Sequence, residues 1–369
     1  MKVNYPYLHQ QFKNYKPFFK DLEELVKSGQ FTLGPYVEKF EKKFAKFIGM
    51  KYAIGTNNGT EALTLSLKSL NIGQGDEVIT VANTFIATVG AIVATGAKPV
   101  LVDCDDRYQI DISKIEKAIT KKTKAILPVH WAGAPCEIDK VLKIAKKFKL
   151  YVVEDACPAV GAFYKGKRCG TFGKVNAFSM HPLKPLNVWG DGGIIVTNDE
   201  KINKFLRLYR NHGMLDRDHI SIWGVNNRLQ PFQAVIANRL LDEIPTLVKK
   251  RNEIAKIYDQ GLLGIPEIIL PKRFEHSLEA YQLYKIRVIN NKRDLLIKYL
   301  KDNKIDCAIH YPIPIHLQKC AKKLMYQKKD FPETEMHAKQ ILTLPCHQYL
   351  STNQANFVVK KIYSFFYQC

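Results

Sequence analysis

Short hydrophobic runs rich in β-branched residues alternate with helix-like patterns through the first two thirds of the chain. Such alternation is typical of an α/β fold, in which helices cover a mostly parallel sheet. The runs predicted as strands are residues 77–81, 99–103, 125–129, 151–154 and 193–197. Glycine and proline fall at the joints between these runs, where elements are expected to end. We therefore expect an α/β protein whose first domain is built on such a sheet.

One segment, residues 138–150, shows the helical period with particular clarity. Its apolar members are Ile138, Val141, Leu142, Ala145 and Phe148, and the lysines between them are Lys140, Lys143, Lys146, Lys147 and Lys149. The spacing predicts a helix with one face in the core and a solvated basic face opposite.

The pattern of the chain changes after about residue 245. A strand-like run at 284–288 precedes a helix-like run at 295–300, and a proline- and histidine-rich stretch follows at 310–316. We predict a large α/β domain of residues 1–245 and a small C-terminal α+β domain of residues 246–369.

Composition excludes several classes of protein. The 369 residues are 46% hydrophobic and 25% charged, which suits a globular protein with a substantial core. No apolar run approaches the roughly 20 residues that a membrane-spanning helix needs, and the first residues lack a signal-type apolar stretch. We expect no membrane segment and a cytoplasmic location.

The eight cysteines are scattered along the chain without a CxxC pair. Neither a disulfide framework nor a zinc site is expected from such spacing. We predict no metal site and reduced thiols at most of these positions, which are Cys104, Cys136, Cys157, Cys169, Cys307, Cys320, Cys346 and Cys369.

The net charge is strongly positive, at +21 from 56 basic and 35 acidic residues. Such an excess suits a polyanionic partner. However, the lysines follow helical faces, and no nucleic-acid-binding motif is present, so nucleic-acid binding is disfavoured. A non-catalytic regulatory or nucleic-acid-binding protein stays as the alternative from another class.

Three features together point to chemistry. Asp155 follows the predicted strand 151–154, at the edge where open α/β sheets bind ligands. Lys184 lies in a proline-bracketed loop before the glycine-rich residues 190–193. Asn58 is a candidate N-cap of a helix, whose first amides attract phosphate. A phosphate anchor, a carboxylate and an amine are what pyridoxal phosphate requires of a protein.

In their order along the chain and in their amino-acid sequences, these segments resemble the DegT/StrS-type sugar aminotransferases, which are fold type I pyridoxal-phosphate enzymes. The resemblance covers nearly the whole chain. It rests on residues 31–35 (FTLGP) with Val37, Phe40 and Glu41, 58–63 (NGTEAL), 84–88 (TFIAT), 154–156 (EDA), 178–184 (FSMHPLK), 190–193 (GDGG), 224–229 (GVNNRL), 310–312 (HYP) with His316, and 344–345 (LP). It implies a large domain that carries the cofactor and a smaller C-terminal domain that closes the site.

The resemblance also implies residue roles. Lys184 would form the Schiff base with the cofactor, and Asp155 would hold the protonated ring nitrogen. Phe85 would stack on the cofactor ring. Thr60, Glu61 through its backbone, and Ser179 would bind the phosphate, and Asn58 and Gly59 are further candidates for cofactor binding.

Further implied residues concern the partner subunit and the substrate. Asn226 would reach the phosphate of a neighbouring subunit, which implies a homodimer with shared active sites. His310, Tyr311 and His316 would shape the sugar site, although both histidines could equally be structural.

Two departures from the family pattern matter. The family usually has a glutamine where this chain has Pro158, so a contact to the ring hydroxyl of the cofactor is missing there; Cys157 and Val160 also differ from the pattern. A related dehydratase branch replaces the lysine by histidine, whereas this chain keeps Lys184, which favours transamination.

The expected function is transfer of an amino group from a donor, L-glutamate by resemblance, to an oxo-sugar in amino-sugar biosynthesis for surface polysaccharide or a secondary metabolite. The acceptor is expected to be anionic and nucleotide-linked, with a sugar phosphate or sugar acid as the alternative. The sequence does not name the sugar or the carbon that is aminated.

Overall fold

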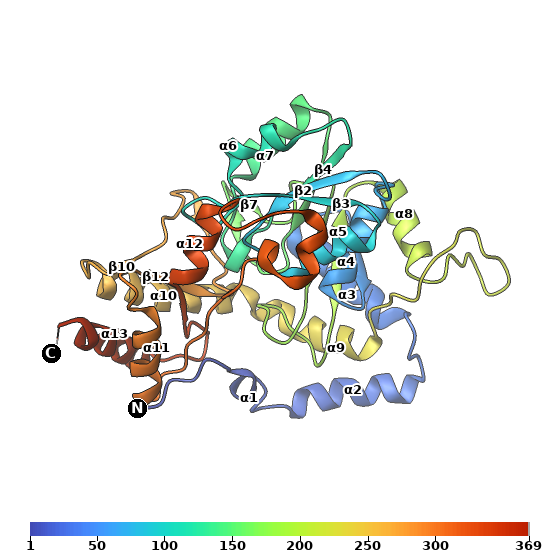
Figure 1. Cartoon of the computed structure of the whole chain (residues 1–369). Coiled ribbons are helices and arrows are strands. Elements are labelled where there is room, and N and C mark those ends of the chain that lie inside the picture. The colour runs from blue at the N-terminus through green and yellow to red at the C-terminus, as the bar shows by residue number, and fades with distance from the viewer. Residues whose placement is uncertain (368–369) are drawn as a thin grey trace.

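The computed structural model describes residues 1–367 and is built around a seven-stranded sheet (Figure 1). Its strands, from one edge to the other, are β1 (Tyr52–Thr56), β9 (Gly193–Thr197), β8 (Val175–Ser179), β5 (Tyr151–Asp155), β4 (Thr123–Leu127), β2 (Glu77–Val81) and β3 (Lys98–Val102). Strand β9 is antiparallel to β1 and β8, and the other neighbours pair in parallel. The sheet is therefore mostly parallel, as predicted.

All five strands predicted in this region are present. The bounds of β2 and β9 are those predicted, and β3, β4 and β5 differ by one or two residues. Strands β1 and β8 were not predicted. β8 contains a fully buried Asn176, whose amide donates to the carbonyl oxygen of Gly170 at 2.9 Å, so a polar residue interrupts its apolar pattern.

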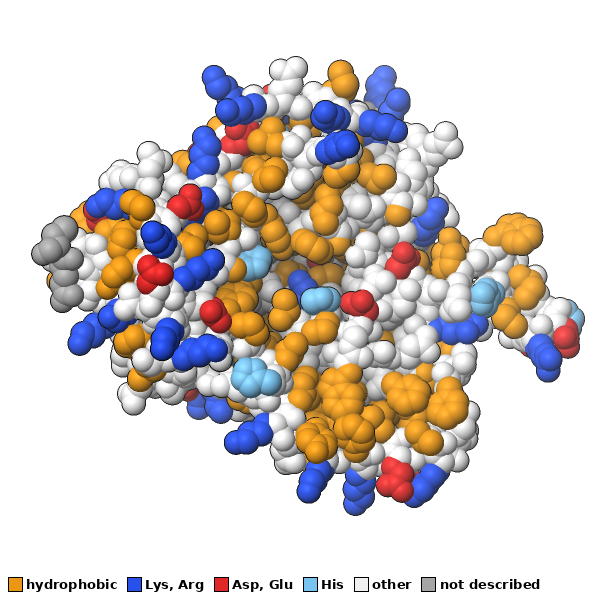
Figure 2. Space-filling model, turned by 60° about the horizontal axis from the view of Figure 1, so that its bottom comes forward, with side chains coloured by type: hydrophobic (Ala, Val, Ile, Leu, Met, Phe, Trp, Pro, Cys, Tyr) orange, Lys and Arg blue, Asp and Glu red, His pale blue; other side chains and the backbone are white. Residues whose placement is uncertain are grey.

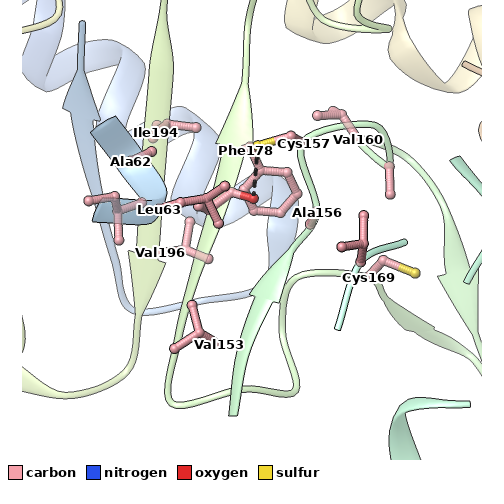
Figure 3. Packing of buried hydrophobic residues seen from close by; sticks show 14 of the residues in the cluster. Ala62, Leu63, Val153, Ala156, Cys157, Val160, Cys169, Phe178, Ile194 and Val196 are labelled. Carbon is pink, nitrogen blue, oxygen red and sulfur yellow. Dashed lines mark hydrogen bonds between the residues drawn. The ribbon is translucent and has the colours of Figure 1, made fainter. Parts of the chain in front are cut away.

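Helices surround this sheet. They are α2 (Lys16–Ser28), α3 (Pro35–Ile48), α4 (Gly59–Lys68), α5 (Ile86–Ala94), α6 (Ile112–Ala118), α7 (Ile138–Lys147), α8 (Glu200–Tyr209) and α9 (Pro231–Leu240). Figure 3 shows Leu63 of α4 lying beside Phe178 of β8 and Ile194 and Val196 of β9. This packing fixes the N-terminal end of α4 near the ends of β8 and β9.

Helix α7 confirms the predicted amphipathic segment. Val141 and Ala145 are buried, and all five lysines of the segment are exposed. Phe148 was predicted on the core face of the helix. The helix instead ends at Lys147, and the Phe148 ring is exposed.

A second group of elements follows the large sheet in the chain. It comprises α10 (Ile244–Leu262), β10 (Ile268–Ile269), β12 (Tyr284–Val288), α11 (Arg293–Asp302), α12 (Pro332–Gln340), β13 (Ile341–Leu344) and α13 (Thr352–Tyr367). Strands β10, β12 and β13 form an antiparallel sheet in that order. The short strands β11 (Ser277–Leu278), β6 (Phe163–Tyr164) and β7 (Lys167–Arg168) form a third sheet, which joins this group to the large one.

Helix α10 takes part in two hydrophobic cores. Leu247 and Val248 belong to the core of the large sheet, whereas Ile254 and Tyr258 belong to a second core around β12 and β13. Val3 also lies in the second core, and the N-terminus runs beside α11, followed by α1 (Leu8–Gln11) (Figure 1). The division at residues 245 and 246 stays a prediction; it falls in the first turn of α10.

A long arm leaves the body between α8 and α9. Asn211 pairs with Asn226 at its base, and Met214 pairs with Ile220 farther out. The arm projects on the right of Figure 1 as a yellow-green loop.

The seven cysteines within residues 1–367 are all free thiols, and Cys369 lies outside the described residues. Among the described residues, no helix has both the length and the apolar character needed to cross a bilayer.

Candidate active site

Lys184 lies in the loop between β8 and β9. The loop folds back on itself, because the amide of Met180 donates to the Gly192 carbonyl oxygen at 2.7 Å and that of Val188 to the Met180 carbonyl oxygen at 3.0 Å. A turn within it joins the Lys184 amide to the His181 carbonyl oxygen at 2.8 Å. The half-buried lysine therefore extends from a constrained loop.

Asp155 is the last residue of β5 and is 4% exposed. Its Oδ2 accepts a hydrogen bond from Thr88 Oγ1 at 2.7 Å, and its Oδ1 accepts one from the Cys157 amide at 3.1 Å. Thr88 is itself bonded to Thr84 Oγ1 at 2.8 Å. These contacts from α5 and from the turn after β5 fix the plane of the carboxylate.

The start of α4 confirms the predicted N-cap. Asn58 Oδ1 accepts from the Glu61 amide at 2.9 Å. The first amides of a helix have no carbonyl partner within it, so those of Gly59 and Thr60 are available to a ligand. A Cβ built on Gly59 would lie 2.6 Å from Ser179 Cβ, so only glycine allows this close approach of helix and strand.

These elements surround a cavity of about 290 Å³. Figure 2 shows this face of the protein hollowed near its centre, with histidine side chains at the edge of the hollow. The predicted site residues that line the cavity are Asn58, Gly59, Thr60, Phe85, Asp155, Ser179, Lys184, His310 and Tyr311. Residues far apart in the sequence therefore meet at one place.

Three predicted site residues do not line this cavity. The Glu61 carboxylate accepts from Asn227 Nδ2 at 2.8 Å, and its amide is the one capped by Asn58. Asn226 is exposed at the base of the arm. His316 is 3% exposed and lies against Glu335, with 3.1 Å between Nε2 and Oε1.

The position of His316 favours the structural interpretation. Its ring also packs edge-on against Phe331, with 4.8 Å between the ring centroids. A buried, paired histidine of this kind stabilises the packing of α12 and does not reach the substrate cavity of its own chain.

Burial and nearby charges in the cavity shift the pKa values of His310 and Tyr311. Burial and the Lys184 ammonium lower the pKa of His310 to about 4. Burial and the Asp155 carboxylate raise the pKa of Tyr311 to about 12. At neutral pH, His310 is therefore uncharged and Tyr311 keeps its proton. Burial, reinforced by Asp155, also raises the pKa of the Cys157 thiol.

Several lining residues were not predicted from the sequence. Thr88 lies within the 84–88 segment, and its spacing of four from Thr84, which stands just before α5, is a signal that could have indicated it. Trp131 and Gln282 also line the cavity, but nothing in their local sequence marks them. Pro158 lines it too and offers no side-chain hydrogen bond.

The cavity residues fit pyridoxal phosphate. Gly59 lets the start of α4 approach Ser179 closely, so that two free helix amides and the Ser179 hydroxyl lie together and make a cradle suited to a phosphate. Asp155 offers a buried carboxylate to a protonated ring nitrogen, and Lys184 offers an amine to an aldehyde. Fold and site together define a pyridoxal-phosphate enzyme of the aminotransferase class.

The comparisons with known proteins give the family. The sequence model of the DegT/DnrJ/EryC1/StrS aminotransferase family matches residues 14–363. The chain belongs to this family, which is pyridoxal-phosphate-dependent, and it is an aminotransferase.

Curated relatives cover nearly the whole chain. A protein named pleiotropic regulatory protein, from Geobacillus stearothermophilus, is 38% identical over 97% of both chains. The dTDP-3-amino-3,6-dideoxy-alpha-D-galactopyranose transaminase of Aneurinibacillus thermoaerophilus is 39% identical over 92% of this chain and 93% of its own. The dTDP-3-amino-3,4,6-trideoxy-alpha-D-glucose transaminase of Streptomyces venezuelae is 37% identical over 92% and 90%.

Solved structures agree with the fold. DesV from S. venezuelae, in complex with ketimine intermediate, superimposes with a TM-score of 0.95 and 34% identity over 100% of this chain and 99% of that one. NtdA from Bacillus subtilis with bound cofactor PMP has a TM-score of 0.93 and 30% identity over 100% of this chain and 86% of that one. The expected fold type I architecture is therefore confirmed.

Proposed function

We propose that this aminotransferase moves an amino group from L-glutamate to the oxo group of a nucleotide-linked sugar and so serves amino-sugar biosynthesis. The observation that carries the proposal is the single cavity that joins Lys184, Asp155 and the start of α4. The names of two relatives, at 37% and 39% identity, describe transaminases of dTDP-linked amino sugars and support this class of acceptor.

Asp155 would bind the ring nitrogen of the cofactor. A carboxylate that is 4% exposed favours a positively charged partner, so it would keep that nitrogen protonated. Thr88 and the Cys157 amide orient the carboxylate for this contact. When bound, pyridoxal phosphate supplies the electron sink that lets a proton leave the donor's Cα.

Lys184 would carry the cofactor and act as the proton carrier. Its Nζ, freed by the donor's amino group, would take the proton from the donor's Cα and later return one to the product carbon. His310 lies near this amine and has a pKa of about 4, because burial and Lys184 disfavour its charged form. It would therefore leave proton transfer at neutral pH to Lys184.

The phosphate would lie at the start of α4. The amides of Gly59 and Thr60 and the hydroxyl of Ser179 would bind it, aided by the positive end of the helix dipole. Phe85 lines the cavity and is 51% exposed, and the centroid of its ring lies 5.7 Å from that of Tyr311. Its ring would therefore cover one face of the cofactor ring.

A homodimer would complete the site. Large apolar side chains are exposed around α2 and α9, where Tyr15, Phe19, Phe31 and Phe232 are between 42% and 57% exposed. Figure 2 shows hydrophobic side chains gathered on the lower part of this face. An exposed apolar patch of this kind commonly marks a protein interface, and a second copy of the chain would cover it.

The arm between Asn211 and Asn226 supports the same assembly. Trp223 is 94% exposed on it, and Leu215 is 65% exposed. Large apolar side chains exposed together on a projecting arm commonly mark a surface that a partner buries. Within a dimer, the arm would place Asn226 at the phosphate of the other subunit.

The positive net charge supports an anionic acceptor. An excess of 21 positive charges raises the local concentration of a nucleotide-linked or other anionic sugar. We expect kcat/KM for the acceptor to fall as salt rises, since the screening length is only about 8 Å at physiological ionic strength. Equal, salt-independent turnover of a neutral oxo-sugar would contradict this part of the proposal.

A panel of oxo-sugars with glutamate as donor tests the proposal. It contains dTDP- and UDP-linked oxo-sugars, sugar phosphates and sugar acids, with amino-sugar formation measured by mass spectrometry. Turnover confined to the phosphates or acids would replace the nucleotide-linked acceptor by the alternative class. A purified protein without visible cofactor absorbance would favour a regulatory function. A cytoplasmic location stays a prediction.

A further inference from the structure

A second, smaller cavity adjoins the cofactor cavity. Its volume is about 40 Å³, enough for a few non-hydrogen atoms. It shares Leu183, Gln282, Leu283 and His310 with the cofactor cavity, so the two are neighbours. The remaining lining comes from the N-terminus and from the segments at β12 and after β13, namely Tyr5, Tyr7, Tyr284, Leu344, Cys346 and His347.

The lining of this second cavity is polar but carries no charge. It contains no lysine, arginine, aspartate or glutamate. Burial lowers the pKa of His347 to about 4, with Arg251 nearby acting in the same direction, and the pKa of His310 is lowered to the same value. Burial raises the pKa of Tyr5 well above its usual range. All three side chains are therefore neutral at pH 7.

The lining offers both hydrogen-bond donors and acceptors. His347 Nε2 donates to the Asn4 carbonyl oxygen at 3.1 Å, so its Nδ1 carries a lone pair, and that atom has no partner within residues 1–367. The Tyr7 hydroxyl accepts from Arg251 Nη2 at 2.9 Å, which leaves the tyrosine proton free to be donated. Gln282 adds an amide and Tyr5 adds a hydroxyl, and each group can donate or accept.

This pattern is complementary to a hydroxyl group. A hydroxyl both donates and accepts, whereas a carboxylate has no proton for His347 and finds no cation in the lining. A phosphate would bring a charge that no lining side chain neutralises. Leu183, which precedes Lys184 in the chain, and His310 line both cavities, so the second cavity also lies close to the reacting amine.

We propose that the second cavity binds a hydroxyl of the acceptor sugar on a carbon next to the one that is aminated. The inference rests on the proposed function and narrows it to acceptors that carry this hydroxyl. The anionic nucleotide would then lie outside the second cavity, toward the open side of the site.

Product binding to the Lys184→Ala protein loaded with pyridoxal phosphate tests the proposal without turnover, because this variant lacks the proton carrier. The probes are dTDP- and UDP-linked amino sugars in matched pairs, with and without a hydroxyl on a carbon next to the amino carbon. One such pair is dTDP-3-amino-3,6-dideoxygalactose and its 4-deoxy counterpart. Kd is measured from the change in visible absorbance of the bound cofactor. We expect the hydroxylated member of at least one pair to bind about 10-fold tighter, or more.

Two variants and a matched control assign the effect to the second cavity. Tyr5→Phe removes a hydroxyl, and Gln282→Leu removes the amide; no hydrogen bond within residues 1–367 uses either group. Each should narrow the ratio of Kd values to about 3-fold or less. Tyr363→Phe, at a residue 52% exposed on α13, should leave the ratio unchanged.

The outcomes separate this inference from the proposed function. Equal binding of both members of every pair, or an unchanged ratio in both cavity variants, would overturn the hydroxyl site and leave the proposed function standing. Failure of every probe to bind would overturn the nucleotide-linked acceptor itself, and the hydroxyl site with it.

Discussion

Thr88 donates a hydrogen bond of 2.7 Å from its Oγ1 to Oδ2 of Asp155. Because its single proton is used in this bond, Thr88 must accept in its 2.8 Å contact with Thr84 Oγ1, so Thr84 is the donor there. The chain of two hydroxyls anchors the carboxylate to α5. The other carboxylate oxygen is oriented by the Cys157 amide.

Thr88→Val should weaken cofactor binding and slow turnover, because an unanchored Asp155 carboxylate holds the ring nitrogen less well. We expect the Kd for pyridoxal phosphate to rise about 10-fold, in line with the loss of one hydrogen bond to a charged group. Fluorescence titration of the apoenzyme measures this. Thr88→Ser, which keeps the hydroxyl, should bind nearly as the wild type does. Equal affinity in Thr88→Val and the wild type would contradict the role given to this contact.

Gly59→Ala should damage the phosphate cradle. The new Cβ would lie 2.6 Å from Ser179 Cβ and 3.2 Å from Cys157 Sγ, so the start of α4 must move. We expect at least about a 10-fold loss of cofactor affinity and about 1–3 kcal/mol of lost stability.

Gly90→Ala is the matched control for this change. Gly90 lies inside α5, and a Cβ there would meet nothing within 4 Å. The variant should bind the cofactor normally and be slightly more stable, since alanine favours a helix by about 1 kcal/mol. Similar cofactor affinity in both variants would show that the close approach at Gly59 is not required.

The protein should lose stability in mild acid. Burial lowers the pKa values of His310, His337 and His347 to about 4, below the roughly 6.5 of an unfolded histidine. At these three residues the unfolded chain binds more protons between these values, so their joint contribution to the free energy of unfolding falls as pH drops below about 6.5; His130, whose pKa is raised, offsets part of it. Each histidine contributes at most roughly 1.4 kcal/mol per pH unit.

Urea unfolding at pH 7.5, 6.5 and 5.5 measures this dependence. His337→Gln should make the pH dependence shallower, because that ring is buried against Tyr108 and its Nε2 has no hydrogen-bond partner among the described residues. His276→Gln, at an exposed position just before β11, should not change it. A free energy of unfolding that stays constant from pH 7.5 to 5.5 would contradict the neutral, buried histidines.

Subunit exchange tests whether two chains build each site. Lys184→Ala and Asn226→Ala homodimers should both be impaired. After mixing and exchange, half of the dimers pair the two variants, and each of these holds one intact site. Activity should then recover to about a quarter of the wild-type value. A monomeric preparation with full activity would contradict the shared site.

Much of the fold follows from local patterns that the sequence displays. Strands such as β2 and β9 are runs of β-branched residues with glycine or polar residues at their ends, so their bounds were predictable. The cap at Asn58 is also local, because its partner is the amide three residues on. A contact between residues only three apart depends on few neighbours, so the local sequence is enough to predict it.

What escaped prediction depends on distant parts of the chain. Val3 pairs with Ile305, and the strand that contains Asn176 is stabilised by a turn from another segment. Gln282 reaches the cavity only because β12 is placed beside the large sheet. His316 was a reasonable candidate by position, and its partner Glu335, on α12, is what makes it structural.

The central claim is that Lys184 is the lysine that carries the cofactor. Borohydride reduction of the purified holoenzyme followed by peptide mapping tests it most directly, with the Lys184→Ala protein as control. The account predicts a reduced pyridoxyl label on Lys184 alone among the 45 lysines, no label in the control, and no turnover by a control that remains folded. A label on any other lysine, or turnover by Lys184→Ala, would contradict it.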